Sequence, residues 1–283
     1  MAKAAAEAKA AASKAAGNPE ATRELCKRTI NDLRTLPQEQ KEKAAVVLNA
    51  LVASGPDFTA VLLKEGAIRP LVDLLSGFPG SQIAAANALA GLSAVSEAHR
   101  NAIAAAGGLV PLVDILKAGS NKAAVVSSSA IAILSQDPVH CPPLVGAGAV
   151  KPLVRMIIEG TADAQLHAAL CLANLCCSWE VAEGFEETAI RGNRDAQDAV
   201  TTAGAIPFLL MMLSSGKTQS HGALSIARLV AFNASNQKAV ATEGGIAPLL
   251  ALLNGASVSA ACHAAFAIAE LARGSRQQLL GNP

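Results

Sequence analysis

Three histidines stand at matching positions in three similar stretches of the chain, and each begins a set of side chains spaced for one helix face. In each set, an apolar residue follows the histidine after three positions and a polar residue after seven. The three sets are His167/Leu170/Asn174, His221/Leu224/Arg228 and His263/Phe266/Glu270. Residues at i, i+3 and i+7 share a face of an α-helix. We therefore expect three recurring surfaces that can contact and hydrogen-bond a bound chain, with contacts that respond to imidazole titration near about pH 6.5.

Neither the histidines nor the cysteines have the spacing of a metal site. Packed helices lie ~8–10 Å apart, whereas zinc ligands must all lie within ~2.0–2.1 Å of one ion. No cysteine belongs to a C-x-x-C pair, and we interpret all six as reduced, packed thiols of an intracellular protein: Cys26, Cys141, Cys171, Cys176, Cys177 and Cys262. We expect no metal and no cofactor.

The chain has no motif of an enzyme active site. It lacks a nucleophile elbow, a phosphate-binding loop and an H-E-x-x-H segment. Cys176 follows His167 by nine residues, about two and a half helical turns, so these two side chains do not form a nucleophile–base pair. We expect no catalytic residues and no enzymatic activity.

Composition narrows the classes of partner. The net charge is +1, which argues against a large nucleic-acid interface, and aromatic residues make up only 2% of the chain, which argues against base-stacking platforms. No apolar run reaches the ~18 residues of a membrane-spanning helix. Residues 1–18 are rich in alanine and lysine. We interpret them as a flexible or helical tail, while an organelle transit peptide stays open.

One glycine phrase recurs five times and indicates which elements position the histidines. Each copy has a glycine, a small or apolar residue and then a Leu-rich run. The copies begin at Gly66, Gly107, Gly148, Gly204 and Gly244, in steps of 41, 41, 56 and 40 residues. A period near 40 is typical of a solenoid in which each helical repeat buries its apolar faces against its neighbours. Each phrase should join a short helix to a longer apolar helix, and a third helix should follow.

The third helices share a size pattern that predicts a buried stripe. Each ends at a leucine, has a large aliphatic residue three positions earlier and has a small residue seven positions earlier. The final leucines are Leu51, Leu92, Leu134, Leu175, Leu229 and Leu271, and the small residues are Ala44, Ala85, Ser127, Ala168, Gly222 and Ala264.

This three-helix unit resembles the armadillo repeat in its period, its glycine phrase and an Ala-rich third helix that ends like Leu172–Leu175. The resemblance covers about residues 20–283 and implies an all-α, right-handed superhelix of about five repeats. We expect a partial repeat at 19–54, an insertion at 178–193 and an incomplete C-terminal helix at 274–283. The five repeats are expected at about 55–94, 95–135, 136–177, 194–232 and 233–273.

The resemblance also implies that the third helices line a concave groove that binds an extended peptide. Importin-α-type members use a Trp and an Asn four residues apart on each third helix. In this chain the Asn position keeps only Asn174 and the Trp position keeps no Trp. A catenin-type groove needs a long basic wall, and here mainly Arg228 is available. The three histidine sets are therefore the expected partner-binding residues, in repeats three to five.

The insertion contains Trp179 and Phe185 together with four glutamates, Glu180, Glu183, Glu186 and Glu187. Insertions in repeat arrays often lie on a binding face. A solvated loop that only lengthens the third helix is the alternative.

We interpret the chain as a non-enzymatic scaffold or adaptor that binds a protein or peptide in the groove of repeats three to five. One alternative is a structural subunit of a larger protein assembly, and another is a nuclear transport adaptor, despite the depleted Trp/Asn ladder. The expected location is intracellular, in the cytoplasm or the nucleus. We expect no nucleic-acid partner and no direct membrane insertion.

Overall fold

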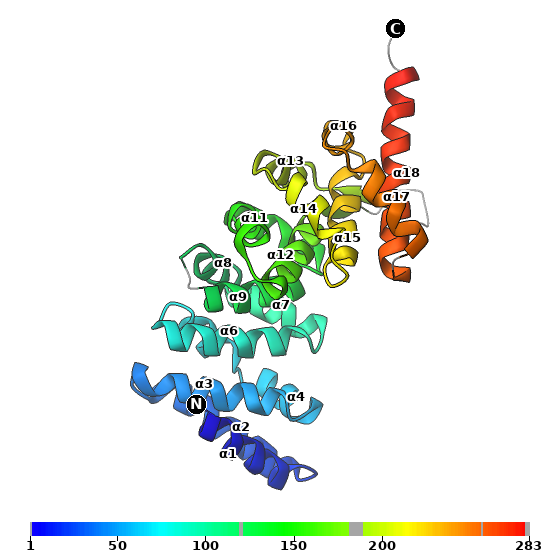
Figure 1. The fold of residues 1–283 in the computed structure, drawn as a ribbon. Coiled ribbons are helices and arrows are strands. Elements are labelled where there is room, and N and C mark those ends of the chain that lie inside the picture. Colours follow the sequence, from blue (N-terminus) through cyan, green and yellow to red (C-terminus); the bar gives the residue numbers. More distant parts are fainter. Residues whose placement is uncertain (1, 119–120, 181–188, 256, 281–283) are drawn as a thin grey trace. The chain divides into compact units, whose positions relative to one another are not determined.

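The computed structural model describes residues 2–118, 121–180, 189–255 and 257–280, and it is almost entirely helical (Figure 1). Its contacts divide the chain into two compact units, Met1–Leu134 (unit 1) and Ser135–Pro283 (unit 2). The boundary falls where the sequence places the junction between the second and third repeats. Each unit is described by itself below.

Unit 1 contains nine helices within its described residues. They are α1 (Ala2–Ala15), α2 (Pro19–Thr35), α3 (Gln38–Val52), α4 (Pro56–Lys64), α5 (Ile68–Leu74), α6 (Pro79–Ser93), α7 (Glu97–Ala105), α8 (Leu109–Ala118) and α9 (Asn121–Leu134). The third helices α3, α6 and α9 pack in sequence order, α3 on α6 and α6 on α9. The Ala/Lys-rich start is a helix that packs on α2 and α3 and buries Ala8, Ala12 and Ala15.

Unit 2 repeats the same plan within its described residues. Its elements are η1 (Pro138–His140), α10 (Cys141–Gly146), α11 (Val150–Glu159), α12 (Ala162–Leu175), β1 (Cys177–Glu180), β2 (Ala189–Gly192), α13 (Arg194–Thr202), α14 (Ile206–Met212), α15 (Gln219–Val230), α16 (Ala234–Thr242), α17 (Ile246–Gly255) and α18 (Val258–Leu280). The third helices α12, α15 and α18 again pack in order.

The glycine phrases end the short helices, as the sequence predicts. All five first glycines have φ between 76° and 82°, a left-handed conformation that an L side chain adopts at a cost. After Gly66 the amide of Ala67 donates to Leu62 O at 3.0 Å, and after Gly244 the amide of Gly245 donates to Val240 O at 2.9 Å. These bonds are those of the Schellman motif, which ends a helix and turns the chain.

The predicted buried stripe is confirmed. Five of the six final leucines are at most 1% exposed, and Leu271 in the last layer is 6% exposed. The small residues permit close approach: a Cβ added at Gly222 would lie 2.9 Å from Cβ of Met212 in the preceding helix. Ser127, which takes the small position in α9, is buried and donates its hydroxyl to Leu112 O at 3.1 Å. Packing between helices therefore sets this pattern.

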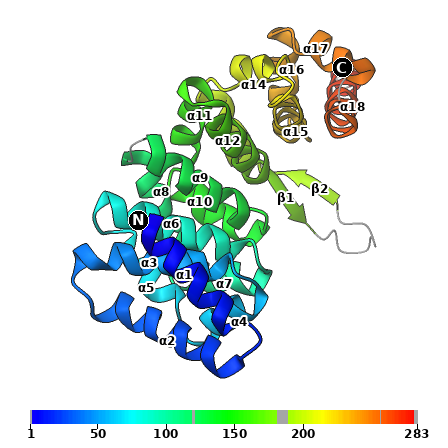
Figure 2. The same ribbon diagram turned by 60° about the horizontal axis from the view of Figure 1, so that its bottom comes forward.

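Two segments differ from the sequence-based expectation. The insertion begins and ends as an antiparallel two-stranded ribbon, β1 with β2, in which Trp179 pairs with Ile190 (Figure 2). The side chain of Trp179 and the whole of Phe185 lie outside the described residues. Residues 274–280 do not begin a separate helix, because they continue α18 without a break. The other third helices that lead directly into a short helix end within two residues of their final leucine.

Among the described residues, no single helix has both the length and the apolar character needed to cross a membrane. Two pairs of consecutive helices are long and apolar enough for a membrane span when the two helices are taken together, but each pair is strongly bent. These pairs are Glu97–Ala105 with Leu109–Ala118, and Pro138–Gly146 with Val150–Glu159.

Candidate functional site: the histidine face of unit 2

The three histidines lie close together along α12, α15 and α18, and we call the surface of these helices around His167, His221 and His263 the histidine face. His221 is near enough to both other rings that each, if charged, would lower its pKa. All three side chains are half-buried. The structure therefore brings together residues that are 54 and 42 positions apart in the sequence, because the third helices of successive repeats pack side by side.

Burial is the main cause of a lowered pKa in all three imidazoles, so they are neutral at pH 7. Asp163 opposes this effect at His167. The ring of His263 lies 3.3 Å through Nδ1 from Ser220 O, and because a carbonyl only accepts, Nδ1 carries the proton. Nδ1 of His167 and of His221 is buried and has no hydrogen-bond partner among the described residues.

Beside the histidines, a cavity of about 260 Å³ opens between the end of α12, α15 and α18, and we call it the α15–α18 cavity. Four of the expected partner-binding residues line it: Leu224, Arg228, His263 and Phe266. Five further lining residues escape the sequence interpretation: Cys176, Cys177, Ala227, Ala231 and Cys262. Of these five, Ala227 and Ala231 could have been predicted from helical spacing, because they follow Leu224 by three and seven positions.

Two of the three cysteines that line the cavity, Cys176 and Cys177, are buried. Burial raises the pKa of Cys176 and of Cys177, although Arg228 opposes this at both. The side chain of Arg228 therefore lies close to the Cys177 thiol. None of the six cysteines, all of which the structure describes, forms a disulfide, and Cys262 alone among them is exposed. Burial raises the pKa of Cys26 to about 11 and that of Cys141 to about 12, so these thiols are poor nucleophiles at neutral pH.

The expected partner-binding residue Glu270 has interactions within the protein. Glu270 is only 1% exposed. It accepts a hydrogen bond from Phe232 N at 3.1 Å and pairs with Arg273 at 3.0 Å. The expectation that Glu270 offers a polar contact on the binding surface is therefore wrong, because its buried carboxylate instead accepts from the partly buried amide of Phe232 and pairs with Arg273.

Asn174 and Leu170 lie on the histidine face without lining the cavity. Both side chains are half-buried. Asn174 donates through Nδ2 to Ser135 Oγ at 3.2 Å, which ties α12 to the start of unit 2. An asparagine with such a bond differs from one that is free to clamp a peptide backbone.

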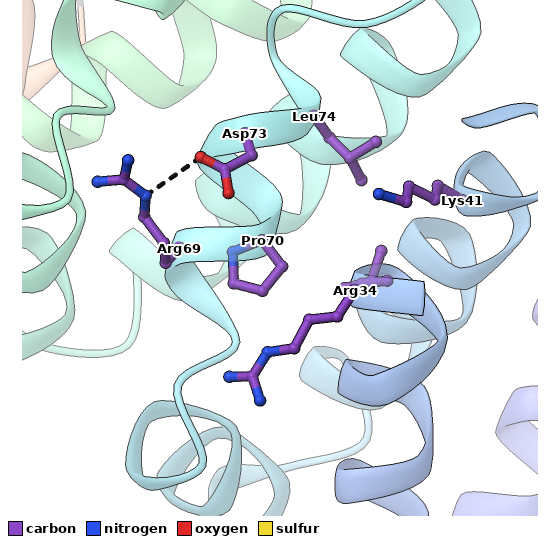
Figure 3. Close-up of a pocket in the computed structure, with 7 residues that line it drawn as sticks. Arg34, Lys41, Arg69, Pro70, Asp73 and Leu74 are labelled. Carbon is purple, nitrogen blue, oxygen red and sulfur yellow. Dashed lines mark hydrogen bonds and ion pairs between the residues drawn. The ribbon is translucent and has the colours of Figure 1, made fainter. Parts of the chain in front are cut away.

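A cavity of similar volume, about 260 Å³, lies in unit 1 and contains more charge (Figure 3). Its cations serve the fold. Arg69 pairs with Asp73 at 3.1 Å. Arg34 donates to Glu65 O and Gly66 O at 3.5 and 3.4 Å, which places its charge at the carboxyl end of α4. Arginine at a helix C-terminus stabilises the last carbonyl groups, so the arginines of this cavity already have structural roles.

The described residues contain no cluster of three or more His, Cys, Asp or Glu side chains that could hold a metal ion. The histidine face therefore offers neutral imidazoles, one guanidinium and an apolar cavity, which are groups for contact and hydrogen bonding.

Comparisons with solved structures identify the fold. An engineered protein is 25% identical with a TM-score of 0.75, over 88% of this chain and 97% of its own. A designed armadillo repeat protein is 22% identical with a TM-score of 0.74, over 87% of this chain and 99% of its own. Another designed armadillo repeat protein, solved in complex with the peptide (KR)4, is 22% identical with a TM-score of 0.71, over 87% and 98%.

No known family profile and no curated protein matches the sequence. The repeat period, the left-handed glycines, the buried third-helix stripe and these structural neighbours agree with one another, and the chain therefore has the armadillo-like repeat fold.

Proposed function

We propose that the chain is a non-enzymatic scaffold or adaptor that binds an extended segment of a partner protein on the histidine face. The observation that carries the proposal is the α15–α18 cavity, to which two successive third helices and the end of a third contribute. A segment lying across α12, α15 and α18 would contact each repeat in turn, which is how repeat proteins build extended binding surfaces. A peptide ligand of one structural neighbour supports this kind of partner.

The partner of that neighbour is a peptide of lysine and arginine, and its identity does not transfer with the fold. The charge that lines the α15–α18 cavity here is Arg228, which would repel a basic segment. We therefore propose a different ligand for this chain, and nuclear transport of a basic cargo is disfavoured.

Partner capture by the intact chain tests the function. Replacement of His221, Leu224 and Arg228 together by alanine should abolish capture. It removes an imidazole of the histidine face, an apolar side chain that lines the cavity, and the positive charge of Arg228. Replacement of Asn87 and Ser129 by alanine is the matched control, because these residues hold related positions on α6 and α9 of unit 1. Circular dichroism checks that each variant is folded. Equal capture by both variants would contradict the assignment to unit 2.

The insertion is tested in the same experiment by deletion of residues 178–193. Reduced capture would assign the insertion to the binding surface. Unchanged capture would support the alternative of a solvated loop.

A structural subunit of a larger assembly is the second candidate, and an exposed stripe on α17 favours it. Ile246, Leu250 and Leu253 are 45%, 46% and 42% exposed. The equivalent residues of α11, Val150, Val154 and Ile157, are buried. An apolar stripe of this kind commonly marks a protein–protein contact.

Light scattering on the purified chain separates the two candidates. A monomer that is unchanged by Leu250→Glu supports an adaptor. Self-association or a stable co-purified partner, lost in Leu250→Glu, supports a subunit.

A further inference from the structure

The α15–α18 cavity contains one charged side chain in an otherwise apolar and neutral lining. Leu224, Ala227, Ala231 and Phe266 supply hydrocarbon. Cys176 and Cys177 are neutral because burial raises the pKa of each thiol, and His263 is neutral at pH 7 because burial lowers its pKa. Arg228 keeps its charge, since a guanidinium does not lose its proton in proteins.

The size of the cavity fits one apolar side chain. A dry cavity of ~150 Å³ holds a benzene molecule, and this cavity has about 260 Å³. Phe266, which is 40% exposed, forms part of the wall. A leucine or phenylalanine of a partner could therefore enter and gain contact with hydrocarbon on several sides.

No ion pair joins Arg228 to a carboxylate among the residues whose side chains the structure describes, a set that leaves out residues 178–192. Its guanidinium lies close enough to Cys177 to oppose the rise in the pKa of that thiol, and a thiol is only a weak acceptor. Two acids on the neighbouring helices already have other contacts: Glu270 of α18 binds Phe232 N and Arg273, and Asp163 of α12 lies near His167. A guanidinium beside an apolar cavity gains most from a carboxylate, which it binds through two parallel hydrogen bonds.

We propose, building on the proposed function, that the α15–α18 cavity takes a leucine or phenylalanine side chain of a partner peptide while Arg228 binds an aspartate or glutamate close to it. The partner of unit 2 is thus an acidic–apolar segment. The cavity supplies affinity through apolar contact, and Arg228 supplies the selection for charge.

Selection from a displayed library of random twelve-residue peptides tests this specificity on the full chain. Binders of the wild-type protein should be enriched in a Phe or Leu within three residues of an Asp or Glu. Enriched binders should weaken at least about tenfold on Arg228→Gln, as expected when one partner of a charge pair is removed. Phe266→Ala should weaken them as well, and because Phe266 is exposed this variant should fold normally.

Two substitutions outside the cavity serve as matched controls. Arg155→Gln removes an exposed arginine of α11, and Phe78→Ala removes an exposed phenylalanine of unit 1. Neither should change binding. A charge exchange completes the test: Arg228→Glu should lose the selected acidic peptide and regain binding when its acidic residue is replaced by lysine.

The outcomes distinguish this inference from the function on which it rests. Peptides that bind equally to wild type, Arg228→Gln and Phe266→Ala, or that are enriched in lysine and arginine, would overturn the inference. The scaffold function would survive if those peptides still required His221 and Leu224. Absence of any enriched peptide would overturn both, and self-association that Arg228→Gln abolishes would assign the cavity to a second copy of the chain.

Discussion

The third helices of the two units are built alike on their buried side and differently on the neighbouring face. In α6 of unit 1 the residues equivalent to a histidine set are Ala84, Asn87 and Gly91, which are small and uncharged. A Cβ added at Gly91 would lie 2.9 Å from Cγ1 of Val52, so this face of unit 1 is used for close packing of α3 on α6. In unit 2 the position of Gly91 is taken by Arg228 on α15.

This difference separates the residues that make the fold from those that we propose to select a partner. The buried stripe is the same in both units because every layer must exclude water in the same way. The adjacent positions are free to vary, and only in unit 2 do they carry imidazoles, a guanidinium and an exposed phenylalanine. The following experiments, from the largest expected effect to the smallest, test this separation.

Core substitutions should be equally severe in both units. Leu89 of α6 and Leu172 of α12 hold the same stripe position, and both are at most 1% exposed. Leu89→Ala and Leu172→Ala should each lower the free energy of unfolding by about 2–5 kcal/mol, through lost burial and a residual cavity. Urea denaturation followed by circular dichroism measures this. A markedly milder effect in unit 2 would break the equivalence of the two stripes.

The turn after α15 should depend on a carboxylate that unit 1 does not use. Phe232 has a positive φ of 55°, its amide is bound by Glu270 at 3.1 Å, and Arg273 lies 4.6 Å from its ring centroid. Glu270→Ala should lower the free energy of unfolding by about 1–3 kcal/mol, since it removes the charged acceptor of the partly buried Phe232 amide and the ion-pair partner of Arg273.

The same denaturation measurement provides the control for Glu270. Ile133→Ala in α9 changes the equivalent position of unit 1, where the cost should come only from lost packing. If Glu270→Gln, which retains an acceptor oxygen, were as damaging as Glu270→Ala, the loss would not come from the unsatisfied amide.

The glycine turns should behave alike in both units. Gly107 and Gly244 have φ of 80° and 76°, and a Cβ added at either would meet nothing within 4 Å. Gly107→Ala and Gly244→Ala should therefore each cost only the left-handed backbone penalty, about 1–2 kcal/mol. Thermal and urea denaturation of the two variants should agree with each other. A neutral substitution at either site would show that the turn relaxes to another conformation.

Acid sensitivity should be confined to the histidine face. Because burial lowers the pKa of His167, His221 and His263 from 6.5, the unfolded chain binds more protons than the folded chain below that value. The stability contribution is complete above about pH 6.5 and is lost as pH falls through the lowered pKa values. The free energy of unfolding should thus fall as the pH is lowered from neutral through 6.5 and onward through the lowered pKa values of the folded chain.

The control for acid sensitivity removes the titrating groups. Replacement of the three histidines by glutamine should flatten this pH dependence. Residues at the equivalent positions of unit 1, Ala84 and Val126, do not titrate, so substitutions there should leave it unchanged. An equally steep pH profile in the glutamine variant would contradict the assignment.

Local and periodic features of the chain could be predicted from sequence, whereas contacts between distant residues could not. The five glycine turns and the buried leucines follow from spacing alone. Glu270 was misjudged because helical spacing places it on a face without showing that α18 turns its carboxylate toward the amide of Phe232. Cys176, Cys177 and Cys262 were missed as cavity residues because they approach Arg228 only through packing of α12, α15 and α18.

The amino-acid sequence by itself determined the repeat, the order of its three helices and the residues of its buried stripe, because helix periodicity and backbone preference act over a few residues. Only the tertiary structure decided that the C-terminal helix continues to Leu280 and that the insertion starts as a β-ribbon. It also decided that Arg228 borders the α15–α18 cavity. Each of these features depends on contacts between helices of different repeats. Those contacts join residues that are far apart in the chain, so local sequence patterns do not reveal them.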